Sequence, residues 1–259
     1  MPNVSLCGSL TLADTTLQTV RHEVAQVNGA DAHYSRAGRD GSPLVLVHGG
    51  AGNRHDWAKN IEALSEAHQV YAPDLLGYGQ NFRDDTPHTV RRFSDFLGDF
   101  MDAVGLRSAS LVGHSLGARV CLDLAQRQPD KTDMLVLAAP IGFGRLSVPG
   151  YILGTVGWAL SKLARRRLPY PPLDIELNER SHEHLRTVTA PSLIVWGRWD
   201  LFFPHRYALR VVETIPNSSL SVFPRSGHAP HRNEPSAFNA AVLAFLSSGL
   251  SSGESNPQG

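Results

Sequence analysis

The sequence predicts one α/β domain built on a mostly parallel sheet, with helices on both faces of the sheet. Three observations support this prediction. From Leu44 onward, short apolar runs alternate with longer segments whose apolar residues recur at helical spacing. An antiparallel hairpin precedes them, because Asn28-Gly29 is a strong two-residue turn signal between two strand-like runs. The length of 259 residues suits one domain with an insertion and is enough to bury a sizeable core.

Composition argues against several classes of protein. Lysine plus arginine and aspartate plus glutamate number 24 each, so the charge balance gives no reason to expect a nucleic-acid partner. The two cysteines, Cys7 and Cys121, lie far apart, which argues against a disulfide framework and favours a reducing compartment. No signal peptide is recognisable, and no window reaches the ~18 consecutive apolar residues of a membrane span. We therefore expect a cytoplasmic protein that acts on a small molecule; its oligomeric state stays open.

The expected elements follow in order along the chain. Continuous apolar runs at 44–47 and 134–139 are typical of strands buried on both faces of a parallel sheet, and Pro129 ends a helix that begins at Leu116. The expected strands lie at 16–27, 30–37, 44–47, 69–72, from Ser110 to the turn at Gly113, and at 134–139, 192–197 and 220–223. The expected helices lie at 56–68, 89–104, 116–128, 151–167, 204–214 and 236–246.

Residues 141–191 interrupt this alternation and form an insertion. An amphipathic helix is expected at 151–167, and it ends in three consecutive arginines. Ligands of open parallel sheets bind beyond the carboxyl ends of the strands, where this insertion emerges, so we expect a lid over the site. A basic end beside an apolar face is also typical of helices on membrane surfaces, which leaves weak surface association through this helix as an alternative. The core is then 16–140 and 192–248, with flexible termini at 1–15 and 249–259.

A chemical motif lies at the junction of a predicted strand and helix. Gly113-His114-Ser115-Leu116-Gly117 matches the G-x-S-x-G nucleophile elbow. The chain must turn from strand to helix within about two residues, so side chains at the two glycines would meet neighbouring backbone. This turn would lift the Ser115 hydroxyl clear of the sheet at the N-terminus of a helix. The alternative is an ordinary strand-to-helix turn with a buried serine.

A serine hydroxyl is a weak nucleophile unless a neighbouring base accepts its proton. The expected base is a histidine, and a carboxylate is needed to fix the tautomer of that histidine. Asp200 follows the strand at 192–197, and His228 follows the strand at 220–223. The chain order Ser115, Asp200, His228 is that of α/β serine hydrolases, so these three residues are the expected catalytic triad. Asp200 could instead cap the helix that begins near Pro204, and His228 could be a surface histidine.

A glycine cluster follows the strand at 44–47 and reads His48-Gly49-Gly50-Ala51-Gly52. Its spacing does not fit the dinucleotide fingerprint G-x-G-x-x-G, and no acidic ribose ligand follows. With an elbow serine downstream, the expected role is an oxyanion hole formed by the backbone amides of Gly50 and Leu116. A flexible loop or a phosphate-binding turn is the alternative.

The other histidines are expected to play structural roles. His48 and His114 flank the site on turns, where they would hold loops in place, and His231 could neighbour His228. His182 and His184 form a pair without a third ligand nearby, so we expect no metal. No motif indicates a cofactor.

Several of these motifs together resemble the α/β-hydrolase fold superfamily, in matching order over about residues 20 to 248. They are His48-Gly49-Gly50, the turn 74–79, the elbow 113–117, the run 196–200 and Gly227-His228. The run Trp196 to Pro204 also resembles hydrolases that cleave carbon–carbon bonds in meta-cleavage products of aromatic degradation. The chain departs from those enzymes in the loop 50–52, in Ala229 after the histidine and in a shorter insertion.

The expected activity is hydrolysis of a small to medium, largely apolar carboxylic ester. Aromatic and aliphatic side chains near the expected site suggest an apolar substrate pocket. They are Tyr151, Leu153, Trp158, Trp199, Phe202 and Phe203. Two alternatives remain: carbon–carbon hydrolysis of a dienoate, and a small-molecule receptor that retains the triad.

Overall fold

The strands form a single sheet, and the carboxyl ends of its parallel strands, which the expected site residues follow, lie on one side of it. The computed structural model describes residues 20–81, 88–163 and 185–251. In these ranges eight strands pair in the order β1-β2-β4-β3-β5-β6-β7-β8. β1 and β2 pair antiparallel, β2 pairs antiparallel with β4, and every pairing from β4 to β8 is parallel. The bounds are β1 Arg21–Val27, β2 Ala30–Ala37, β3 Ser42–Val47, β4 His68–Pro73, β5 Ala109–His114, β6 Thr132–Ala138, β7 Ser192–Gly197 and β8 Ser218–Phe223. The predicted fold class is confirmed.

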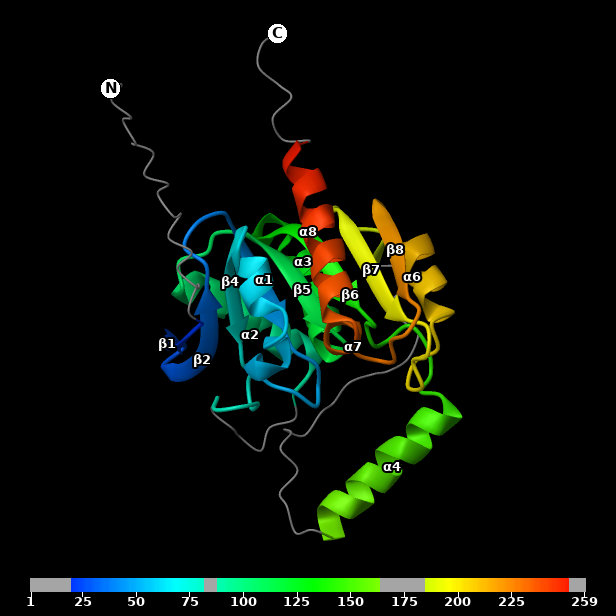
Figure 1. Cartoon of the computed structure of the whole chain (residues 1–259). Coiled ribbons are helices and arrows are strands. Elements are labelled where there is room, and N and C mark those ends of the chain that lie inside the picture. The colour runs from blue at the N-terminus through cyan, green and yellow to red at the C-terminus, as the bar shows by residue number, and fades with distance from the viewer. Residues whose placement is uncertain (1–19, 82–87, 164–184, 252–259) are drawn as a thin grey trace, which may run out of the picture.

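Helices cover both faces of this sheet (Figure 1). One face packs against α2, α3 and α6, and the other against α1 and α8. Their bounds are α1 Ile61–Ser65, α2 Val90–Ala103, α3 Leu116–Arg127, α6 Tyr207–Thr214 and α8 Pro235–Ser251, and short helical turns lie at η1 Arg54–Trp57, η2 Pro129–Lys131 and α7 Pro230–Asn233.

The two cores explain why the central strands are apolar without interruption. In β3, Val45 and Val47 pack on the α2/α3 side, whereas Leu44 and Leu46 pack on the α1/α8 side. Successive side chains of a strand point to opposite faces, so a strand covered on both faces needs apolar residues at every position. All four of these side chains are fully buried.

The helix expected at 56–68 is wrong, because two shorter pieces, η1 and α1, replace it. Asn53 caps η1 by accepting a hydrogen bond from the amide of His55. Asn60 separates the two pieces, and its buried amide group donates to the carbonyl of His231 and to Oδ1 of Asn239. These hydrogen bonds to distant residues compete with a continuous helix, and the spacing of apolar residues in the sequence gives no sign of them. At the other end of the chain, α8 runs to Ser251, although a flexible terminus was expected from 249.

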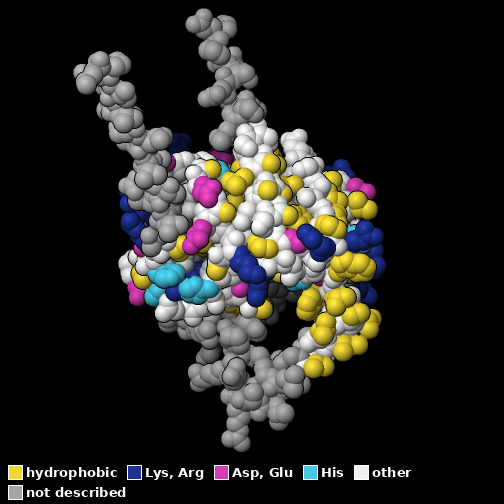
Figure 2. All heavy atoms as spheres, viewed as in Figure 1, with side chains coloured by type: hydrophobic (Ala, Val, Ile, Leu, Met, Phe, Trp, Pro, Cys, Tyr) yellow, Lys and Arg dark blue, Asp and Glu magenta, His cyan; other side chains and the backbone are white. Residues whose placement is uncertain are grey.

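Helix α4, Val148–Leu163, lies within the expected insertion 141–191 and starts earlier than the expected 151. It follows β6, leaves the carboxyl edge of the sheet and extends away from the body (Figure 1). Hydrophobic side chains gather on its surface in Figure 2, and Tyr151 and Ile152 are 63% and 54% exposed. Residues 164–184, with the expected end of this helix and the pair His182 and His184, lie outside the described residues. The helices within the described ranges are not long and apolar enough to cross a bilayer.

Candidate active site

Ser115 is the single residue between β5 and α3, and its backbone is strained, with φ 51° and ψ −109°. Two glycines permit this turn. A Cβ on Gly113 would lie 2.5 Å from the Cα of Ala118, and a Cβ on Gly117 would lie 2.2 Å from the carbonyl oxygen of Val47. Both contacts are to backbone, which cannot swing away as a side chain can. Such strain persists only where the surrounding structure enforces it, as at functional sites.

Three side chains from three carboxyl ends meet at this turn. Nε2 of His228 lies 3.0 Å from Oγ of Ser115, and Nδ1 of His228 lies 2.8 Å from Oδ2 of Asp200. Because a carboxylate only accepts, the Nδ1–H of His228 donates to Asp200 and Nε2 is left to accept the hydroxyl proton of Ser115. The structure thus brings together the three residues expected to form the triad.

The carboxylate of Asp200 is fully buried and accepts more than the histidine bond. Its Oδ1 accepts the backbone N–H groups of Phe202 and Phe203, at 2.8 and 2.9 Å. Sequence reasoning missed these two donors, although an aspartate that bonds to amides two and three residues onward is a known turn pattern. The turn fixes the carboxylate before it meets the imidazole. It does not cap α6, which begins only at Tyr207.

The glycine loop after β3 packs against the first residue of α3. A Cβ on Gly50 would lie 3.4 Å from Cδ2 of Leu116, and a turn bond from the amide of Gly52 to the carbonyl of Gly49 closes the loop at 3.1 Å. Within the described ranges, the amides of Gly50 and Leu116 donate to no protein acceptor. These two amides, on adjacent segments next to Ser115, remain the candidate donors of an oxyanion hole.

Buried polar groups hold this glycine loop in place. Nε2 of His48 accepts the N–H of Leu75 at 2.9 Å, which leaves its Nδ1–H to donate to the carbonyl of Gly49 at 2.8 Å. Burial lowers the pKa of His48, so the imidazole stays neutral and can make both bonds. Asp74 accepts the amide of Arg54 at 2.7 Å and also pairs with its guanidinium. His48 therefore has the loop-holding role expected for it.

Of the six residues expected in the substrate pocket, two lie close to the imidazole of His228. The ring centroids of Phe202 and Phe203 lie 5.3 and 5.7 Å from that of His228. Trp199, which neighbours Asp200 in the sequence, is 64% exposed, and its indole N–H donates to the carbonyl of Pro224. Tyr151 and Leu153 lie on exposed surface of α4, and the side chain of Trp158 lies outside what the structure describes.

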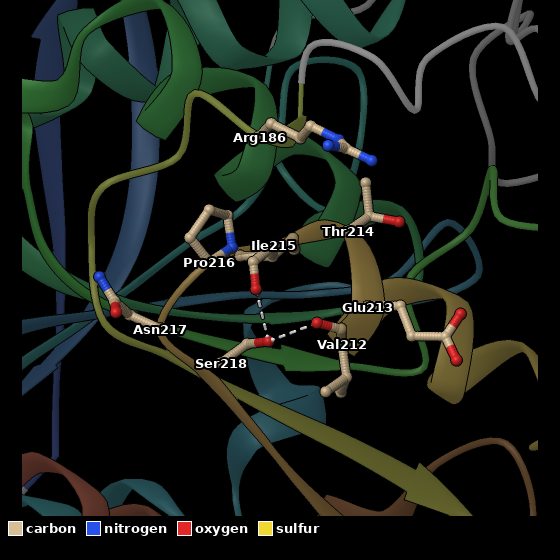
Figure 3. A pocket seen from close by; sticks show the side chains of 8 residues that line it. All are labelled: Arg186, Val212, Glu213, Thr214, Ile215, Pro216, Asn217 and Ser218. Atoms are coloured by element: carbon tan, nitrogen blue, oxygen red, sulfur yellow. Dashed lines mark hydrogen bonds between the residues drawn. The ribbon is translucent and has the colours of Figure 1, made fainter.

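A hollow of about 410 Å³ lies at the amino end of β8, on the side of the sheet opposite to the carboxyl ends of the parallel strands (Figure 3). Ser218, the first residue of β8, lines it, and its hydroxyl donates to the carbonyls of Val212 and Ile215. Parallel strands place this amino end of β8 far from the carboxyl end of β5, where Ser115 lies. The hollow therefore does not belong to the site around Ser115. Its remaining lining residues are Arg186, Glu213, Thr214, Pro216 and Asn217.

His231 is predicted to make the fold sensitive to acid. Its side chain is fully buried, and burial, with smaller effects of Arg232 and His228, lowers its pKa from 6.5 to about 3. Between these two pH values the unfolded chain binds a proton that the folded chain excludes, so stability is complete above pH 6.5 and falls as the pH decreases. We expect His231→Phe to spare the protein about 2 kcal/mol of the loss between pH 8 and pH 5. Urea unfolding at both pH values measures this, and equal losses in the two proteins would refute it.

Comparison with known proteins agrees with this architecture. Residues 42–169 match the family model of the alpha/beta hydrolase fold. The chain is 30% identical to RutD of Caulobacter sp. (strain K31), proposed to be a carbamate hydrolase, over 80% of this chain and 91% of that protein. It is 27% identical to a 2-hydroxy-6-oxononadienedioate/2-hydroxy-6-oxononatrienedioate hydrolase of Comamonas testosteroni, over 84% and 91% of the two chains. The carboxylesterase CesB of Bacillus subtilis superposes with a TM-score of 0.78 at 21% identity, covering 88% and 92%. The chain belongs to the α/β-hydrolase fold family.

Proposed function

We propose that this α/β hydrolase cleaves small to medium, largely apolar carboxylic esters through an acyl-enzyme on Ser115. The observation that carries the proposal is the continuous hydrogen-bonded line from Ser115 through His228 to Asp200, with separations of 3.0 and 2.8 Å. An otherwise weak alcohol nucleophile is activated by this arrangement.

The geometry supports a two-step acyl transfer. Oγ of Ser115 attacks the ester carbonyl while Nε2 of His228 takes its proton, and Asp200 stabilises the imidazolium. The amides of Gly50 and Leu116 would donate to the tetrahedral oxyanion, where one such donor is typically worth about 2.7–4 kcal/mol. His228 then protonates the leaving alcohol. Water, deprotonated by the same histidine, releases the acid and frees Ser115.

The preference for an apolar acyl group rests on the surroundings of the triad. Phe203 is buried and Phe202 half-buried, and both rings lie beside His228, so the surroundings of the candidate base are aromatic. The insertion 141–191 leaves the sheet at the same edge, and we propose that it acts as a lid. The amide of Ser147, just before α4, donates to the carbonyl of Phe202 at 2.8 Å and so ties the lid to these surroundings.

Carbon–carbon hydrolysis of a dienoate is the second candidate. The 27% identity to the Comamonas testosteroni hydrolase favours it, together with the run from Trp196 to Pro204. The sequence Gly50-Ala51-Gly52 departs from the glycine loop of that class, and Ala229 follows His228 where that class usually carries a bulkier residue. We therefore rank it below ester hydrolysis.

A substrate series separates the candidates. We expect measurable multiple turnover of p-nitrophenyl acetate and butyrate, and no bleaching of a yellow 2-hydroxy-6-oxo-dienoate under the same conditions. A p-nitrophenyl carbamate forms a third arm, since the same nucleophile can attack that carbonyl. Bleaching of the dienoate with inert esters would reverse the ranking. A single turnover with every substrate would favour a receptor over an enzyme.

A further inference from the structure

His114, the last residue of β5, bonds to the loop that carries the candidate base. Its Nε2 lies 2.8 Å from the backbone carbonyl oxygen of His228. A carbonyl oxygen only accepts, so Nε2 carries the proton and donates it. The imidazole of His114 is buried, and the bond joins positions 114 residues apart in the chain. It therefore fixes one loop of the site to the strand that directly precedes Ser115.

The other edge of the same ring borders the glycine loop. A Cβ on Gly49 would lie 2.7 Å from Nδ1 of His114, so the ring occupies the space that this glycine leaves open. Within the described ranges, Nδ1 has no hydrogen-bond partner. His114 thus contacts both loops that flank Ser115, but it forms its hydrogen bond with only one of them.

The surroundings keep His114 neutral. Burial lowers its pKa well below the ordinary value, and the neighbouring His231 and His228 act in the same direction. Its ring centroid is 5.0 Å from that of His228 and 4.6 Å from that of His231, and Arg232 is the nearby cation. A neutral ring here can hold the His228 backbone without repelling the imidazolium that His228 would become. A lysine or arginine could donate the same bond but would oppose that charge.

We propose that His114 is a positioning residue: its Nε2–H holds the backbone of His228 so that the imidazole of His228 stays aligned with Oγ of Ser115. This inference rests on the proposed function, because alignment matters only if His228 accepts the serine proton. A displacement of about 1 Å at reacting atoms can cost about 100-fold in rate. His114 touches no reacting atom in this account, so its effect would fall on the chemical step and not on substrate binding.

Three variants of His114 test the proposal. His114→Phe keeps the ring volume but removes the donor, and we expect kcat for p-nitrophenyl butyrate to fall about 10- to 100-fold with KM within about threefold. His114→Gln places an amide N–H where Nε2 lies and should recover most of this loss. His114→Asn places its amide N–H where Nδ1 lies, so it should not. Equal activity of the Gln and Asn variants, or a wild-type kcat in the Phe variant, would overturn the proposal.

His231→Phe is the matched control, because it makes the same ring exchange at a buried neighbour with no side-chain bond to this loop. Its kcat at pH 8 should stay within about twofold of the wild type, and an equal loss in both Phe variants would instead indicate general packing. The rate of labelling by a fluorophosphonate is measured in parallel. If the wild type is labelled but hydrolyses no ester, the ester proposal fails, and the labelling rates of the Gln and Asn variants still decide the role of His114.

Discussion

Replacing Ser115 with alanine is expected to lower kcat for p-nitrophenyl butyrate by about 10⁴-fold or more, while the chain stays folded. The loss should be this large because, in the proposed mechanism, Oγ of Ser115 is the atom that forms the covalent bond to the acyl group. Steady-state hydrolysis measures the effect, and urea unfolding checks the fold.

Ser110→Ala is the matched control for this prediction. Ser110 is a buried serine on the same strand, β5, and it lies outside the triad. Its loss should leave kcat within about twofold of the wild type. If Ser115→Ala kept most of the activity, the hydrolysis would have to proceed through another nucleophile, and the proposed mechanism would be wrong.

Asp200→Asn is expected to lower kcat by about 10⁴-fold with little change in stability. Oδ1 of the asparagine can still accept the amides of Phe202 and Phe203, so the turn is retained. The new amide group, however, donates to Nδ1 of His228. The imidazole proton then moves to Nε2, which can no longer accept the proton of Ser115.

This substitution separates the two roles of the carboxylate. If Asp200 only held the turn, the asparagine variant would keep its activity. Asp133→Asn, a change to an exposed residue of β6, removes the same charge far from the turn and should leave the rate unaltered. A full rate in Asp200→Asn would show that the fixed tautomer of His228 is not needed.

The parts of the candidate site that could be predicted are those that short sequence motifs indicate. The glycines around Ser115 signal a tight turn, because their role is to leave room for neighbouring backbone, and the structure shows those close approaches at Gly113 and Gly117. The positions of Asp200 and His228 after successive strands follow from the rule that parallel strands end at one edge. The strands themselves were predictable because burial on both faces demands apolar residues throughout.

The parts that could not be predicted depend on contacts between distant segments. Nothing local to Asn60 shows that its side chain bonds to the backbone of His231, which separates η1 from α1. The bond from the indole of Trp199 to the carbonyl of Pro224, 25 residues away, is likewise not visible in the sequence around Trp199. Aromatic residues near a candidate catalytic aspartate suggest a pocket, but the sequence does not show which of them lie beside it.

The bond from His114 to the loop of His228 belongs to the same class, since sequence position placed this histidine beside the nucleophile without showing its partner. The amides of Phe202 and Phe203 were accessible in principle through the turn pattern that begins at Asp200. Local patterns thus identified the candidate reacting groups, whereas the contacts that hold their side chains and loops became visible only in three dimensions.

Active-site labelling tests most directly whether Ser115 is a nucleophile activated by His228. The protein is treated with a fluorophosphonate, and the adduct is counted and located by mass spectrometry, in the wild type and in His228→Ala. We predict one adduct per chain, on the peptide that contains Ser115, and a labelling rate that falls by several orders of magnitude without His228. An adduct on another residue, or an equal rate in both proteins, would contradict the account.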